Sequence, residues 1–96
     1  MDTLYLIHFE AKYKHAQHYL GLSNDIPRRM DEHRSGQDSA LMKAVTQAEI
    51  PWDVVRTWKH ADRMLERRLK SRHKTWKLCP ICNPTSWQHN ANHWKE

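Results

Sequence analysis

The chain has 96 residues, the size of one domain, and its 39% hydrophobic content is enough for a small core. No apolar run is long enough to span a bilayer and the N-terminal residues lack a signal pattern, so we expect a cytoplasmic protein with no membrane partner. The net charge of +5, with eight histidines counted as neutral, favours a polyanionic partner.

Two strands are predicted near the start of the chain. Residues 4–9 form an apolar run rich in strand-forming residues, which indicates a buried central strand. Residues 18–22 indicate a second short strand, and we expect the polar stretch between the two runs to be a hairpin loop. Because successive side chains of a strand alternate between its faces, Tyr19 should share a face with Gly21.

Two helices are predicted to follow the hairpin. Capping residues that end at Asp25, followed by an early proline, predict a helix over residues 26–35 that stops at Gly36. A second helix is expected to begin near Ser39, where apolar residues recur at helical spacing, and to end before Pro51.

The remaining residues predict a third strand, a third helix and a polar tail. Residues 52–58 are strand-like, and residues 61–72 have the periodicity of a helix. Its predicted buried residues are Ala61, Met64, Leu65 and Leu69.

The expected element order is therefore β-β-α-α-β-α, which predicts an α+β fold with a small three-stranded, mainly antiparallel sheet flanked by helices. We expect the first strand to lie at the centre of the sheet and the last helix to pack on one face. This domain should cover residues 1–78, and residues 79–96 should form a separate tail rich in Cys, His and Trp.

Short motifs with chemical potential are spread over most of the chain. Residues 3–5 read Thr-Leu-Tyr, and residues 19–21 read Tyr-Leu-Gly. Arg29 and His33 lie one turn apart on the first predicted helix, and Glu66 lies on the last one. In this order the motifs resemble those of the GIY-YIG nuclease family, whose signatures are Gly-Ile-Tyr and Tyr-Ile-Gly, with threonine here in place of the first glycine.

The resemblance implies the GIY-YIG fold and the hydrolysis of DNA phosphodiester bonds with one Mg²⁺ or Mn²⁺ ion. It implies that Glu66 binds this ion. It also implies that either Tyr5 or Tyr19 handles the nucleophilic water while the other orients it. The sequence leaves open which tyrosine has which role.

The chemistry of phosphodiester cleavage requires the same residue types. The reaction needs an activated water, a Lewis acid and positive charge beside the developing phosphorane. Glu66 offers the hard oxygen ligand that Mg²⁺ and Mn²⁺ prefer, and Arg29 offers a planar fork for phosphate oxygens. His33 can share a proton with a tyrosine or contact the phosphate. Taken singly, each residue also has an ordinary structural interpretation, such as a core tyrosine or a surface ion pair between Glu66 and Lys70.

Basic residues on and after the last helix predict a track for DNA, although they would also suit a solvated helix face. His15 and His18 are candidate groups near the substrate, and His8 is interpreted as structural. The predicted DNA-binding residues are Arg28, Arg63, Arg67, Arg68, Lys70, Arg72 and Lys74.

The tail contains a second candidate metal site. Its Cys-x₂-Cys and His-x₃-His pairs have the ligand types and spacings of a zinc site, which predicts a small zinc knuckle. The alternative is a pair of packed thiols with exposed histidines. The predicted zinc ligands are Cys79, Cys82, His89 and His93.

Three functions fit these patterns. The first is a metal-dependent DNA endonuclease, the second a non-catalytic nucleic-acid-binding module on the same fold, and the third a zinc-stabilised interaction domain. The presence of Tyr5, Tyr19, Arg29 and Glu66 together favours the nuclease, because a passive binder does not need a carboxylate facing phosphate. We expect either low sequence specificity or recruitment to DNA by another protein.

Overall fold

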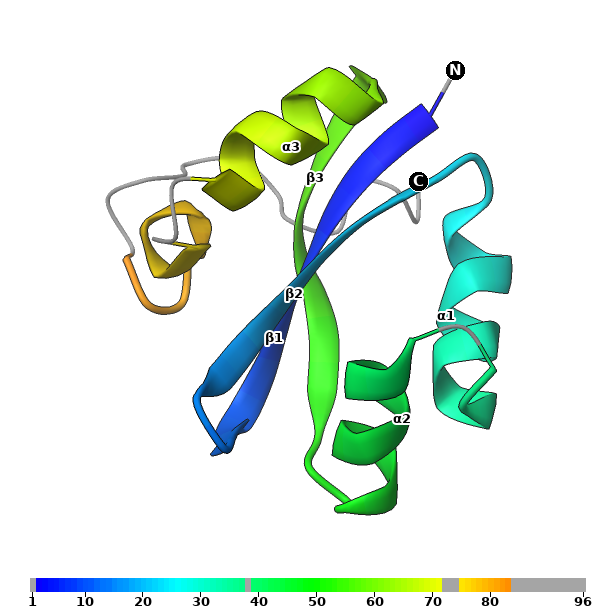
Figure 1. The fold of residues 1–96 in the computed structure, drawn as a ribbon, viewed down its shortest axis with the longest axis vertical. Helices are drawn as coiled ribbons and strands as arrows, with labels where there is room; N and C mark the ends of the chain where they lie inside the picture. The colour runs from blue at the N-terminus through cyan, green and yellow to red at the C-terminus, as the bar shows by residue number, and fades with distance from the viewer. Residues whose placement is uncertain (1, 38, 72–74, 84–96) are drawn as a thin grey trace.

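A three-stranded antiparallel sheet forms the centre of the fold (Figure 1). In the computed structural model, which describes residues 2–37, 39–71 and 75–83, β1 (Asp2–Tyr13) lies between β2 (Ala16–Ser23) and β3 (Trp52–Ala61). Both neighbours of β1 run antiparallel to it. The α+β class, the element order and the central first strand are confirmed.

The β1–β2 hairpin is longer than predicted. The polar stretch expected as a loop is mostly strand, and the turn is confined to Lys14 and His15, with Lys14 at a positive φ of 56°. A register irregularity between His8 and Tyr13 lets the pairing continue to the turn. Backbone pairing does not require apolar side chains, so exposed polar residues extend the hairpin beyond the covered part of the sheet.

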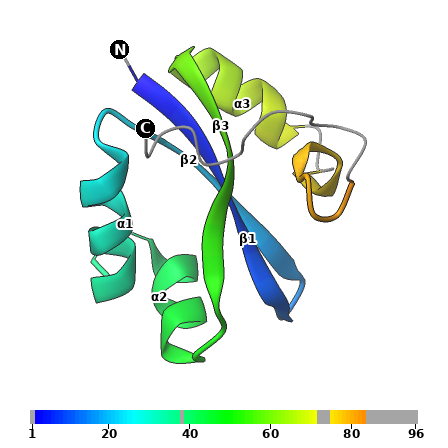
Figure 2. The same ribbon diagram turned by 180° about the vertical axis from the view of Figure 1, so that it is seen from behind.

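Two helices cover one face of the sheet (Figures 1 and 2). Helix α1 (Ile26–Ser35) is capped at its N-terminus by Asp25, whose side chain accepts a hydrogen bond from the backbone N–H of Arg28. Gly36, in the left-handed conformation, caps its C-terminus. Helix α2 (Ala40–Gln47) is capped by the side chain of Ser39, as its sequence predicts. Apolar residues of this face form one core cluster, which contains Tyr5, Ile7, Phe9, Ile26, Met30, Met42, Val45 and Val54.

The opposite face of the sheet is covered by α3 (Arg63–Ser71) and by the segment that begins with the short helix η1 (Thr75–Leu78) (Figure 2). The prediction that Met64 is buried is wrong, because its side chain is 70% exposed. Leu65 and Leu69, one turn apart, form the inward stripe, and Met64 lies one position outside it. The second core cluster contains Leu4, Leu6, Leu20, Val55, Ala61, Leu69 and Cys79.

The helices of the described residues are short. None of them has both the length and the apolar character needed to cross a lipid bilayer. Side chains along β1 alternate between the two faces of the sheet: odd-numbered residues face α1 and α2, and even-numbered residues face α3. This alternation decides which polar residues can meet on each face.

Candidate active site and a metal-ligating cluster

A polar hollow of about 350 Å³ lies at the β2 edge of the sheet. Edge strand β2 contributes Tyr19 and Gly21, α1 contributes Arg29, and α3 contributes Arg63 and Glu66. The elements that meet here are far apart in the sequence but adjacent at this edge. The remaining lining residues are Asp2, Leu22, Ser23 and Asn24.

Two further predicted site residues lie behind this hollow, in the core. The Tyr5 hydroxyl and His33 Nε2 are 2.8 Å apart and hydrogen bonded, and both side chains are fully buried. The ring of Tyr19 packs against both, with its centroid 5.1 Å from that of His33 and 6.1 Å from that of Tyr5. His33 therefore contacts tyrosine rather than the open hollow, and the three rings form one packed unit.

Gly21 allows this unit to form. Tyr5 and Gly21 are direct partners in the β1–β2 pairing, so the phenol of Tyr5 lies over the glycine. A Cβ atom at this position would lie only 2.4 Å from the Tyr5 hydroxyl oxygen and 2.9 Å from Cε1 of Tyr19. The glycine of the Tyr-Leu-Gly motif is thus explained by the close approach of two rings to the backbone.

Glu66 of α3 contributes a carboxylate to the lining of the hollow. Its side chain is 14% exposed, and one oxygen lies 3.3 Å from Nζ of Lys70, one turn further along the helix. Because Lys70 itself is half exposed, this ion pair contributes at most about 1 kcal/mol and does not prevent another cation from binding Glu66. Arg29 forms an ion pair with Glu32, also on α1, in which Nε of Arg29 lies 3.4 Å from a carboxylate oxygen of Glu32.

The predicted basic residues divide by helix face. On α3, Arg63, Arg67 and Lys70 follow the spacing that puts them on the same side as Glu66, whereas Arg68 is exposed on another side of the helix. Arg28 is exposed on α1, beside the hollow-lining Asn24, to which it donates a hydrogen bond. The remaining two predicted DNA contacts, Arg72 and Lys74, lie outside the described residues.

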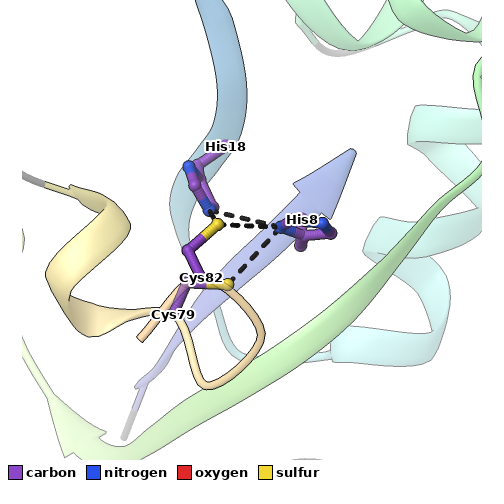
Figure 3. A group of neighbouring side chains, drawn as sticks. All are labelled: His8, His18, Cys79 and Cys82. Atoms are coloured by element: carbon purple, nitrogen blue, oxygen red, sulfur yellow. Dashed lines mark hydrogen bonds between the residues drawn. The ribbon is translucent and has the colours of Figure 1, made fainter. Parts of the chain in front are cut away.

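A second group of chemically active side chains lies on the face of the sheet that α3 covers, opposite to that of Tyr5 and Tyr19. Figure 3 shows its four members, His8, His18, Cys79 and Cys82. One ligand atom from each of His8, His18, Cys79 and Cys82 lies within 4.8 Å of the other three, so the group could hold a metal ion. His8 Nδ1 is 3.4 Å from Sγ of Cys79 and 3.7 Å from Sγ of Cys82. His18 Nε2 is 3.4 Å from Sγ of Cys82 and 3.3 Å from His8 Nδ1.

The fold positions these four residues in two pairs. His8 and His18 are direct partners across the β1–β2 ladder and share the face that α3 covers. Cys79 and Cys82 lie in the turn after η1, which is closed by a hydrogen bond from the Asn83 N–H to the Cys79 carbonyl oxygen. Arg56 of β3 donates to the carbonyl oxygen of Leu78, just before that turn.

Burial determines the protonation state of this group. It lowers the pKa of His18 to about 4, with a further lowering from the charge of His8, and it lowers the pKa of His8 despite the opposing effect of Glu10. Burial and the neighbouring Cys79 raise the pKa of the Cys82 thiol, while Lys12 acts in the opposite direction. Both imidazoles are therefore mainly neutral near pH 7.

The structure changes the roles predicted for two histidines. The sequence predicts a structural role for His8 and a place near the substrate for His18, whereas the structure brings both to the predicted cysteine pair. His89 and His93 lie outside the described residues, so their role as ligands stays a prediction. His15 lies in the hairpin turn and lines a separate shallow hollow. The signal that was missed is the two-residue alternation, which puts a cross-strand histidine pair on one face of a hairpin.

Sequence comparison finds one significant relative among curated proteins. The chain is 30% identical over 76 residues to a UPF0213 protein of Aeromonas hydrophila subsp. hydrophila, and the alignment covers 79% of this chain and 56% of the relative. The chain thus spans about half the length of the curated relative that it matches. No protein-family model matches the chain, and no solved structure matches it significantly.

Replacing Gly21 with alanine should disrupt the packed unit of Tyr5, Tyr19 and His33. The added methyl group meets ring atoms of the buried Tyr5 and the half-buried Tyr19, and the Tyr5 ring cannot move away without repacking of the core. We expect the free energy of unfolding to fall by about 1–3 kcal/mol, the usual cost of overpacking a core. Urea denaturation measures this change. Ala48→Gly, at an exposed position after α2, is the control for a substitution that meets no core side chain. A Gly21→Ala protein as stable as the parent would contradict the close approach described here.

Proposed function

We propose that this protein is a GIY-YIG-type endonuclease that hydrolyses DNA phosphodiester bonds with one Mg²⁺ or Mn²⁺ ion. One observation carries the proposal: Tyr19, Arg29 and Glu66, from three different elements, line the same polar hollow. Tyr5 and His33 lie directly behind it. The family motifs supply the same five residues in the same order, and the name of the similar UPF0213 protein states no activity.

The hollow suits a hard divalent cation at Glu66. The carboxylate is partly shielded yet faces a polar space large enough for several waters, and Mg²⁺ keeps most of its waters when it binds protein. Asp2 lines the same space and adds negative charge there. A divalent ion bound at Glu66 supplies the Lewis acidity that stabilises charge on a phosphorane.

The difference in burial between the two tyrosines assigns their roles in this proposal. Tyr19 is half-buried and lines the hollow, whereas Tyr5 is fully buried and bonded to His33. Tyr19 is therefore the phenol that an attacking water can reach, and it accepts or orients the proton of that water. Tyr5 and His33 are positioning residues, because they act on the reaction through the ring of Tyr19.

Arg29 completes the charge distribution of the site. Arg29 of α1 lines the hollow together with Glu66 of α3, so a phosphate in the hollow would lie near both the guanidinium and an ion bound at Glu66. A planar fork of N–H donors matches two phosphate oxygens at once, and its contact with Glu32 holds it in place. We infer that it stabilises the negative charge that builds on the scissile phosphate.

DNA would reach this hollow along the basic side of α3. Arg63, Arg67 and Lys70 share the side of Glu66, and Arg28 extends the positive surface on α1. Each such residue placed on a phosphate releases a condensed counterion and adds to affinity without reading sequence. The proposed substrate is therefore DNA held mainly by its backbone.

The change Glu66→Gln separates cleavage from binding. It removes the carboxylate charge that binds the metal but preserves the size of the side chain, so we expect cleavage to fall by at least about 10³-fold. Affinity for DNA should stay nearly unchanged, because the Lys and Arg contacts remain. Single-turnover cleavage and salt-dependent binding are measured on the same protein.

Glu49→Gln, on an exposed residue after α2, is the matched control and should behave as the parent. A Glu66→Gln variant that cuts at the parent rate would rule out this site. A parent protein that binds DNA but leaves it intact in both Mg²⁺ and Mn²⁺ would instead identify a binding module on the same fold.

The change Tyr19→Phe tests the assignment of the tyrosines. Loss of this hydroxyl should lower kcat by about 10²–10⁴-fold, the usual contribution of a positioned proton-transfer group. Tyr13→Phe is the matched control, because Tyr13 lies at the hairpin end of β1, far from the hollow. Its single-turnover rate should equal that of the parent. Full activity in Tyr19→Phe together with an inactive Tyr5→Phe would reverse the two roles.

A further inference from the structure

The cluster of two histidines and two cysteines has no part in the proposed cleavage site. It joins the hairpin, through His8 and His18, to a turn that begins 61 residues later in the chain, at Cys79. Both cysteines are free thiols, so no disulfide accounts for their position. The four ligand atoms face one another across a small common space (Figure 3).

Four of the six distances among the ligand atoms are close to the edges of a tetrahedron around one metal ion, and all six are within 4.8 Å. For zinc, metal–nitrogen distances of about 2.0 Å and metal–sulfur distances of about 2.3 Å imply nitrogen–nitrogen edges of about 3.3 Å and nitrogen–sulfur edges of about 3.5 Å. The observed nitrogen–nitrogen distance, between His8 and His18, is 3.3 Å. The three nitrogen–sulfur distances that involve Cys79 and Cys82 are 3.4, 3.7 and 3.4 Å. We propose that these four residues bind one Zn²⁺ ion in a structural site that fastens the segment after α3 to the β1–β2 hairpin.

The ligand types select the ion. Thiolates and imidazoles are soft and borderline ligands that favour zinc over Mg²⁺ or Mn²⁺, which prefer oxygen. Four protein ligands complete a tetrahedral shell and leave no position for substrate water, which is the pattern of structural rather than catalytic zinc. The zinc site and the Glu66 site therefore bind different ions and can be emptied separately.

The burial of the ligands is consistent with an ion that enters from one side. Cys79 is fully buried and His8 nearly so, whereas His18 is partly exposed and Cys82 is exposed. The buried pair belongs to the folded core, and the outer pair can close over an arriving ion. Release of the thiol protons on binding makes affinity rise with pH.

The segment that carries the cysteines buries few apolar side chains. Among residues 75–83, only Leu78 and Cys79 join the core cluster, while Trp76 and Ile81 are exposed. A small segment with so little apolar contact is typically fixed by a metal or a disulfide. Because this segment follows α3, the ion would also hold the helix of Glu66 against the sheet, a consequence that rests on the proposed function.

The first test is metal content and ligand geometry in the full-length protein. Native mass spectrometry of protein purified without chelator should show one zinc ion per chain. Replacement by Co²⁺ should give the intense visible absorption of a tetrahedral site and a thiolate-to-cobalt charge-transfer band. Removal of zinc should lower Tm, and added zinc should restore it. A chain that stays metal-free in excess zinc would overturn the proposal.

The second test identifies the ligands by matched variants. His18→Ala and Cys82→Ser change the more exposed ligands, so the fold should survive, which circular dichroism checks. Each should weaken binding of Co²⁺ by more than about 100-fold, beyond the effect of losing a supporting contact. His15→Ala, in the adjacent turn, should bind as the parent does.

The double variant His89→Ala/His93→Ala decides between the two candidate ligand sets. It should keep one zinc ion per chain and an unchanged Co²⁺ spectrum. Loss of zinc in this variant, with zinc retained in His18→Ala, would overturn the site proposed here and favour ligands in the tail. The readouts are metal content and spectra, so a failure of the nuclease proposal would leave this test unaffected.

Discussion

The register between β1 and β2 is the constraint on which both candidate sites depend. It places Tyr5 opposite Gly21 on one face and His8 opposite His18 on the other. A slip of one residue would reverse the faces of a whole strand and separate both pairs. Buried apolar residues of β1 fix this register, because a slip would also expose part of the two core clusters. The strand register that buries the core is thus the same register that assembles both candidate sites.

The two faces of the hairpin provide two different environments. On the α1 side, aromatic rings and a buried hydrogen bond between Tyr5 and His33 lie behind the polar hollow at the β2 edge, to which α3 contributes the carboxylate of Glu66. On the α3 side, nitrogen and sulfur atoms gather at tetrahedral spacing. A hard oxygen ligand at Glu66 and a softer set of nitrogen and sulfur ligands would let the proposed catalytic ion and the proposed structural ion bind without competing for the same residues.

The sequence predicted the architecture well, because local signals determine it. Apolar runs, the caps at Asp25 and Ser39 and the stop at Gly36 all act within a few residues. The hairpin length was missed because paired polar strands have no apolar signature. That Tyr19 and Glu66 line one hollow could be inferred only from motif order, since it depends on tertiary packing. The meeting of the histidines with the cysteine turn was missed because the two pairs are at least 61 residues apart, so their proximity depends on tertiary packing.

Cleavage of supercoiled plasmid by the zinc-loaded parent protein tests the central claim most directly. The protein is freed of other metals by desalting rather than by chelation, so that the His and Cys cluster stays loaded, and is then assayed with Mg²⁺, with Mn²⁺ and with neither. The account predicts that nicked plasmid accumulates only when Mg²⁺ or Mn²⁺ is added. Plasmid that is bound but stays supercoiled under all three conditions, or that is nicked equally without either ion, would contradict it.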